Sequence, residues 1–259
     1  MRLAAEGRSP ALFAESHDGM LIAYRVHGDQ ESDAATPPVL LVHGFASNAA
    51  VTWEGTGWVR ALLDARRAVI TVDLRGHGES DKPVEADSYA PERLGGDLLA
   101  VLESARADRV DVIGYSMGNR VVSALCSLAP ERVRRVVIGG SGPHELFASW
   151  DLDEARGLLL RAEPPRNRVI EQVLRPAIDA GADREALLAC IQGVAGSPLS
   201  IPGDIPTLFV AGEDDPVPTG VQELALDWDA DFVSIPGRDH VSTLTARAFK
   251  DAAIDFLAA

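Results

Sequence analysis

Short, almost uniformly apolar runs recur along the chain, and amphipathic stretches separate them. Runs of this length without polar alternation are typical of strands buried on both faces of a parallel sheet. The stretch from Pro91 to Ala105 instead repeats its apolar positions at helical spacing. This alternation predicts an α/β fold, in which helices cover both faces of a mostly parallel sheet. The apolar runs are residues 39–42, 68–72, 110–113, 133–138, 207–211 and 232–235.

Two further strands are predicted before the first of these runs. Residues 13–16 and 20–26 flank Asp18-Gly19, a dipeptide that strongly favours a hairpin turn. They bring the predicted sheet to eight strands. We therefore expect an opening hairpin followed by a parallel α/β core.

One stretch of the chain interrupts the alternation. Between residues 142 and 203 the apolar positions follow helical spacing only, which predicts a small helical cap inserted after the fourth parallel strand. The core then consists of residues 1–141 and 204–259. The predicted cap helices are residues 152–163, 166–180 and 184–194.

The most informative polar residue is Ser116, in the sequence Gly114-Tyr115-Ser116-Met117-Gly118. A predicted strand precedes it, and a predicted helix follows it and ends before Pro130. A side chain at such a turn is strained and exposed, and glycines two places away let the chains pass closely. The positive end of the following helix points at whatever binds the serine. This is the geometry that a nucleophile needs.

Three other motifs follow predicted strands. They are His43-Gly44-Phe45, the segment from Asp73 to Ser80, and the segment from Gly212 to Val217. With the Ser116 turn, they make the chain resemble the α/β-hydrolase superfamily over nearly its whole length, and in particular its serine esterases and lactonases with a helical cap. The resemblance implies a mostly parallel eight-stranded sheet.

The resemblance also implies a catalytic triad of Ser116, Asp215 and His240, in the chain order of this fold. Asp215 lies just past a strand end, where open parallel sheets build their sites, and it occupies the family's G-x-x-D position. The neighbouring Asp214 is the competing carboxylate. The loop at residues 139–142, after the fourth parallel strand, offers no carboxylate.

The backbone N–H groups of Phe45 and Met117 are the expected oxyanion hole, since the family places donors at these positions. We interpret His43 as a brace for the loop that carries Phe45, and the segment from Asp73 to Ser80 as a structural turn. Many members of the family have a second glycine where this chain has Asn119. A slightly different helix packing is the expected consequence.

Epoxide hydrolases and haloalkane dehalogenases of this superfamily form an alkyl-enzyme ester through an aspartate in place of Ser116, so the serine argues against both activities. Hydrolysis of a small or medium carboxylic ester or lactone is then the leading activity. Three alternatives stay open: hydrolysis of a carbon–carbon bond in a diketone, perhydrolysis or acyl transfer by the same triad, and non-catalytic ligand binding. The triad mechanism requires no cofactor and no metal. The expected partner is an ester-like small molecule.

Composition narrows the possible partners further. The formal net charge of −15 argues against nucleic acid and against an anionic membrane surface, since both need clustered Lys and Arg. Cys126 and Cys190 are expected to be buried core residues. Met1–Arg8 lacks the apolar core of a signal peptide, and no run of about 18 apolar residues occurs. We expect a soluble, cytoplasmic protein.

Overall fold

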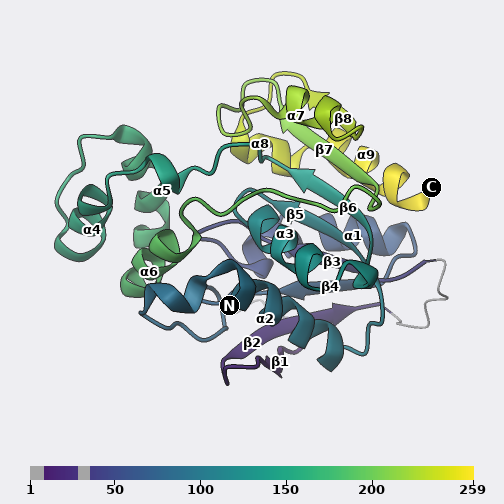
Figure 1. Ribbon diagram of the computed structural model, residues 1–259, viewed down its shortest axis with the longest axis horizontal. Coiled ribbons are helices and arrows are strands. Elements are labelled where there is room, and N and C mark those ends of the chain that lie inside the picture. Colours follow the sequence, from purple (N-terminus) through teal and green to yellow (C-terminus); the bar gives the residue numbers. More distant parts are fainter. Residues whose placement is uncertain (1–8, 29–35) are drawn as a thin grey trace, which may run out of the picture.

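One eight-stranded sheet runs through the computed structural model, which describes residues 9–28 and 36–259 (Figure 1). Met1–Arg8, on which the expectation about a signal peptide depends, lies outside the described residues. No helix within them combines the length and the apolar character needed to cross a membrane. The strands are β1 (Leu12–Glu15), β2 (Leu21–His27), β3 (Val39–Val42), β4 (Val69–Val72), β5 (Val110–Tyr115), β6 (Val133–Gly139), β7 (Thr207–Gly212) and β8 (Asp231–Ile235).

The sheet is mostly parallel, with the strand order β1-β2-β4-β3-β5-β6-β7-β8. Only the pairs β1–β2 and β2–β4 are antiparallel, and the predicted hairpin turn forms at Gly19, whose φ is 82°. The eight-stranded α/β fold predicted from the sequence is therefore confirmed. In the register of the central strands, Val42 lies beside Gly114 and Tyr115 beside Gly139. The residues that follow these strands consequently meet at one edge of the sheet.

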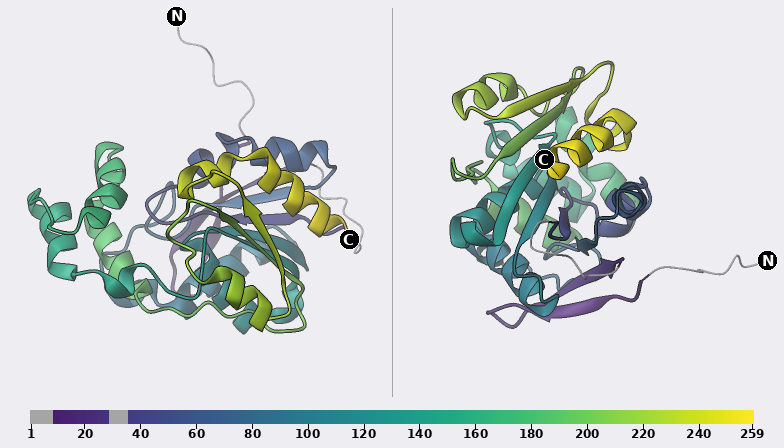
Figure 2. Two further views of the ribbon diagram at one scale, coloured as in Figure 1. Left: turned by 90° about the horizontal axis from the view of Figure 1, so that it is seen from above. Right: turned by 90° about the vertical axis from the view of Figure 1, so that its right-hand side faces the viewer.

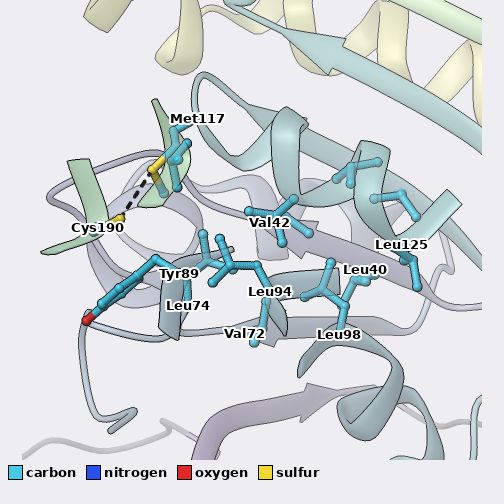
Figure 3. Packing of buried hydrophobic residues seen from close by; sticks show 14 of the residues in the cluster. Leu40, Val42, Val72, Leu74, Tyr89, Leu94, Leu98, Met117, Leu125 and Cys190 are labelled. Atoms are coloured by element: carbon cyan, nitrogen blue, oxygen red, sulfur yellow. Dashed lines mark hydrogen bonds between the residues drawn. The ribbon is translucent and has the colours of Figure 1, made fainter. Parts of the chain in front are cut away.

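Alternate side chains of the central strands enter two separate cores, one on each face. In β3, Leu40 and Val42 pack into the core under α2 (Pro91–Ser104) and α3 (Gly118–Leu128), part of which Figure 3 shows. Val39 and Leu41 pack on the opposite face under α1 (Trp58–Asp64) and α9 (Arg247–Ala258). Both faces are buried, which explains why the strands read as unbroken apolar runs.

Three helices occupy the segment between β6 and β7, where the sequence predicts a cap. They are α4 (Leu152–Arg161), α5 (Arg168–Asp179) and α6 (Arg184–Val194), and they extend from one end of the molecule (Figures 1 and 2). Helix α6 packs closely on the short helix η2 (Ala86–Tyr89): a Cβ atom on Gly193 would lie 2.4 Å from the carbonyl oxygen of Ala86. The domain boundaries stay a prediction.

A buried arginine joins elements on the hairpin side of the sheet. Arg75 follows β4, and its side chain is fully buried. Its guanidinium donates to Asp97 of α2 at 2.6 Å and to Asp18 of the β1–β2 turn at 2.7 Å. It also donates to the carbonyl oxygen of Ser88 in η2 at 3.0 Å, so one side chain ties together the hairpin, α2 and the helix on which the cap rests.

Replacing this arginine should destabilise the protein strongly. Arg75→Ala leaves the Asp97 carboxylate buried without its partner, and breaking a buried ion pair in this way typically costs about 3–5 kcal/mol. Arg60→Ala is the matched control, because it breaks an exposed pair with Asp64 that is worth less than about 1 kcal/mol. Denaturation in urea measures both free energies of unfolding. Equal, small losses in the two variants would contradict the structural role of Arg75.

Candidate active site

The backbone at Ser116 is in the left-handed region, with φ at 52°. The turn lies between β5 and α3, and the two flanking glycines allow it. A Cβ atom on Gly118 would lie 2.4 Å from the carbonyl oxygen of His43, and one on Gly114 would lie 2.3 Å from Oδ1 of Asn119. Atoms do not approach this closely, so both positions require glycine. The sequence therefore turns sharply here and leaves Ser116 partly exposed.

Hydrogen bonds to the loop after β6 hold this strained turn. The Ser116 N–H donates to the carbonyl oxygen of Gly139 at 2.9 Å, and the Ser116 carbonyl oxygen accepts from Oγ of Ser141 at 2.8 Å. The amide of Asn119 donates to Gly139 at 2.9 Å and contacts Ser141 at 3.0 Å. Asn119 is thus a positioning residue that the sequence interpretation missed, since only a change of helix packing was expected there.

Asp215 and His240 meet at the same edge of the sheet. Nδ1 of His240 donates to Oδ2 of Asp215 at 2.8 Å, and Val217 N–H donates to Oδ1 at 2.9 Å. The Asp215 side chain is fully buried and the His240 side chain is 28% exposed. Asp214, the competing carboxylate, is exposed, and the structure places Asp215 against the imidazole instead. Because Nδ1 donates to the carboxylate, Nε2 is the free, basic nitrogen.

The loop that carries His240 is fixed to the loop that carries Asp215. Asp214 N–H donates to the carbonyl oxygen of Arg238 at 3.0 Å. His240 begins the short helix α8 (His240–Thr245), and Asp239 caps that helix by accepting from Ser242 N–H at 2.8 Å. The Ser242 hydroxyl and N–H hold the pKa of Asp239 below its ordinary value. Asp239 is exposed, and its partner is Ser242 of the same helix.

Two adjacent residues at the end of β6, Gly139 and Gly140, contact Ser116 and His240 respectively. The Ser116 N–H bonds to Gly139, while a Cβ atom on Gly140 would lie 3.0 Å from Cε1 of His240. Among the residues that the structure describes, Ser116 Oγ makes no hydrogen bond to His240. Bonds between nucleophile and base are often long without substrate and tighten when substrate binds. The structure thus joins the carboxylate to the imidazole, and the adjacent residues Gly139 and Gly140 lie against the Ser116 turn and against His240.

Two buried histidines support the loop that carries Phe45. Nε2 of His43 accepts from Leu74 N–H at 3.0 Å, and Nε2 of His77 accepts from Ala46 N–H at 3.0 Å. A ring nitrogen that accepts a hydrogen bond is unprotonated, so both imidazoles are neutral. Burial lowers the pKa of His43, and burial together with the neighbouring His43 lowers the pKa of His77 to about 3. This geometry agrees with the interpretation of His43 as a brace.

Asp73 closes the turn beside these histidines. Its Oδ1 accepts from Ala49 N–H at 2.8 Å and its Oδ2 from Glu79 N–H at 2.9 Å. A Cβ atom on Gly78 would lie 2.1 Å from Oδ2 of Asp73, which leaves glycine as the residue that fits. The segment from Asp73 to Ser80 therefore has the role of a structural turn, as its sequence indicates.

Two backbone N–H groups close to Ser116 in the chain or in space have no hydrogen-bond acceptor within the described part of the protein. Within residues 9–28 and 36–259, the N–H groups of Phe45 and Met117 donate to no other group of the chain. Met117 precedes the first residue of α3, so its N–H lies at the positive end of that helix. The two groups predicted to form an oxyanion hole are thus unoccupied donors.

Apolar side chains from the cap cover this end of the sheet. Sγ of Cys190 in α6 lies 3.8 Å from Sδ of Met117, the residue after Ser116 (Figure 3). The ring of Phe45 packs edge-on against Phe147 with 4.8 Å between centroids. Burial raises the pKa of the Cys190 thiol, so it stays protonated, and both cysteines are free and buried as predicted. In the described part of the chain, no group of three or more His, Cys, Asp or Glu could hold a metal ion.

One family model and several curated proteins match part of this chain in sequence. A family model described as "alpha/beta hydrolase fold" matches residues 37–164. The chain is 32% identical over 138 residues to 2-hydroxymuconate semialdehyde hydrolase of Pseudomonas sp. (strain CF600), which is 53% of this chain and 48% of that protein. The chain spans only about a third to a half of the length of the curated relatives that it resembles most, from 34% to 53%.

Solved structures match over almost the whole chain. A hydrolase from Pseudomonas aeruginosa PA01 is 28% identical with a TM-score of 0.73, covering 99% of this chain and 100% of that one. The enol-lactonase from Burkholderia xenovorans LB400 has a TM-score of 0.76 at 23% identity, covering 96% of this chain and 100% of that one. The second likeness concerns the fold alone.

Acid should destabilise the protein partly through His77. Its pKa is about 3 in the folded state and about 6.5 when unfolded, so between these values the unfolded chain binds a proton that the folded one excludes. Stability is then lost as pH falls through this window, at up to about 1.4 kcal/mol per pH unit from this residue. His77→Gln keeps an acceptor for Ala46 N–H. It should lower the slope of unfolding free energy against pH by up to about 1.4 kcal/mol per pH unit, the contribution of one proton.

Denaturant unfolding at several pH values measures the slope. Above about pH 7.5 the curves of His77→Gln and the unaltered protein should run parallel, because His77 is neutral there in both states. Identical slopes between about pH 6 and pH 4 would contradict the neutral, buried state of His77.

Proposed function

We propose that this protein, which belongs to the α/β-hydrolase superfamily, is a serine hydrolase that cleaves a small or medium carboxylic ester or lactone. The observation that carries the proposal is the 2.8 Å hydrogen bond between Asp215 and His240, formed beside the strained turn of Ser116. A buried carboxylate that orients an imidazole next to an exposed hydroxyl is the arrangement that activates a nucleophile.

The reaction follows from these groups. His240 Nε2 accepts the proton of Ser116 as Oγ attacks the acyl carbonyl carbon, and the buried Asp215 carboxylate stabilises the resulting imidazolium. The N–H groups of Phe45 and Met117 donate to the oxyanion of the tetrahedral intermediate, each contributing about 3 kcal/mol of transition-state stabilisation. His240 then protonates the leaving group. Water repeats the sequence on the acyl-enzyme and releases an acid.

The covering of the site supports an apolar acyl group. Phe45, Phe147 and Met117 border the turn, and α6 closes over it through Cys190. Arg120 of α3 is buried, and its guanidinium donates to the carbonyl oxygen of Gly142 at 2.7 Å. An apolar substrate of modest size would exclude water from the oxyanion donors and so strengthen their effect.

Hydrolysis of a carbon–carbon bond is the second candidate. The 32% identity to a 2-hydroxymuconate semialdehyde hydrolase favours it, although the match covers about half of each chain. Perhydrolysis and acyl transfer use the same acyl-enzyme and differ only in the nucleophile that resolves it. Rates on short p-nitrophenyl esters, lactones and vinylogous diketones would distinguish the bond that is cleaved.

A fluorophosphonate and two aspartate variants test the mechanism. We expect the reagent to form one adduct, located on Ser116 by mass spectrometry, and none in Ser116→Ala. Asp215→Asn should lower kcat about 10⁴-fold, because an amide holds the imidazole in the wrong tautomer. Asp214→Asn is the matched control and should stay within about threefold, since Asp214 is exposed. Equal losses in the two variants, or full turnover by Ser116→Ala, would overturn the proposal.

A further inference from the structure

Tyr115, the residue before the nucleophile, contacts the loop of the catalytic base. Its side chain is 4% exposed and packs in the core beside Phe249 of α9, with ring centroids 6.1 Å apart. The Tyr115 hydroxyl donates to the backbone carbonyl oxygen of His240. The tyrosine ring also lies against the imidazole, with centroids 5.2 Å apart. One side chain from β5 therefore touches both the backbone and the ring of His240.

The hydroxyl acts at the first turn of α8. The carbonyl oxygen of His240, which accepts from the Tyr115 hydroxyl, belongs to the first residue of that turn. Helix α8 spans only His240–Thr245, too short to be stable by itself. Asp239, which is exposed to solvent, caps its start, and the buried Trp58 donates from Nε1 to the carbonyl oxygen of Leu244 at 2.8 Å. Tyr115 supplies a buried anchor at His240 itself.

Gly140 packs tightly against the contact between Tyr115 and His240. Gly140 has a φ of 61°, and a Cβ atom on it would lie 3.0 Å from the Tyr115 hydroxyl and 3.0 Å from Cε1 of His240. The glycine thus lets the phenol and the imidazole pack together against the loop after β6. Burial raises the pKa of Tyr115, so the hydroxyl remains a donor over the working range of a hydrolase.

We propose that Tyr115 is a positioning residue, whose hydroxyl fixes the backbone of His240 so that the imidazole reaches Ser116 while it stays on Asp215. Asp215 and Tyr115 act on different parts of His240. Asp215 fixes the rotation of the imidazole ring, and Tyr115 fixes the position of the backbone that carries it. The inference rests on the proposed function, because the positioned group is the proposed general base. A displacement of about 1 Å in such a group can cost about a hundredfold in rate.

Tyr115→Phe tests this role, since it removes one oxygen and keeps the ring. We expect kcat and the rate of fluorophosphonate labelling of Ser116 to fall about tenfold to a hundredfold, while KM stays within about twofold. Tyr24→Phe is the matched control. Tyr24 lies in β2 and is 3% exposed, and its hydroxyl forms a hydrogen bond of 2.9 Å with Oγ of Ser104 in α2. It should lose stability and keep kcat. Both variants are assayed where thermal melts show them fully folded.

A His240→Ala background separates positioning from a direct effect. Because Tyr115 acts through His240, Tyr115→Phe should cause no further loss of labelling rate in that background. A further loss of the same size would overturn the inference, as would equal losses of kcat in Tyr115→Phe and Tyr24→Phe. If the unaltered protein labels at Ser116 and Tyr115→Phe labels at the same rate, the inference alone fails. If the fluorophosphonate does not label Ser116 in the unaltered protein, both the proposed function and this inference are wrong.

Discussion

The contact between the start of α3 and the end of β3 is the constraint on which the site depends. Gly118 lies directly against the carbonyl oxygens of Val42 and His43, at a distance that no side chain permits. This approach forces the left-handed turn at Ser116 and brings the N–H of Met117 beside the loop that carries Phe45. The proposed nucleophile and the proposed oxyanion donors therefore depend on one packing arrangement rather than on separate ones.

Burial divides the histidines by function. His43 and His77 are enclosed, accept backbone N–H groups and stay neutral, so they hold a loop in place. His240 is partly exposed and has its Nδ1 on a buried carboxylate, which leaves Nε2 free for proton transfer. The same residue type thus serves as a brace in one place and as the proposed base in another, according to its hydrogen-bond partners.

The elements that hold the site come from both sides of the sheet. Arg75 secures the hairpin, α2 and η2, and α6 of the cap packs on η2 and reaches Met117 through Cys190. On the opposite side, Tyr115 packs against Phe249 and against the imidazole of His240. The outer helices α4 and α5 extend beyond this framework (Figure 1). The segment between β6 and β7 therefore consists of one helix packed on the core, α6, and two helices farther from it, α4 and α5.

The strands were predictable within about two residues, because a strand buried on both faces must be apolar throughout, as β3 is. The role of the glycines around Ser116 was also predictable, since a sharp turn between a strand and a helix needs residues without side chains at these positions. What the sequence could not reveal were contacts between residues far apart in the chain. For Asn119 the sequence indicated only a change of helix packing, and for Tyr115 it indicated no role. Only the parallel register that places β5 beside β6, and the return of α8 to that edge, brings their side chains to Gly139 and His240.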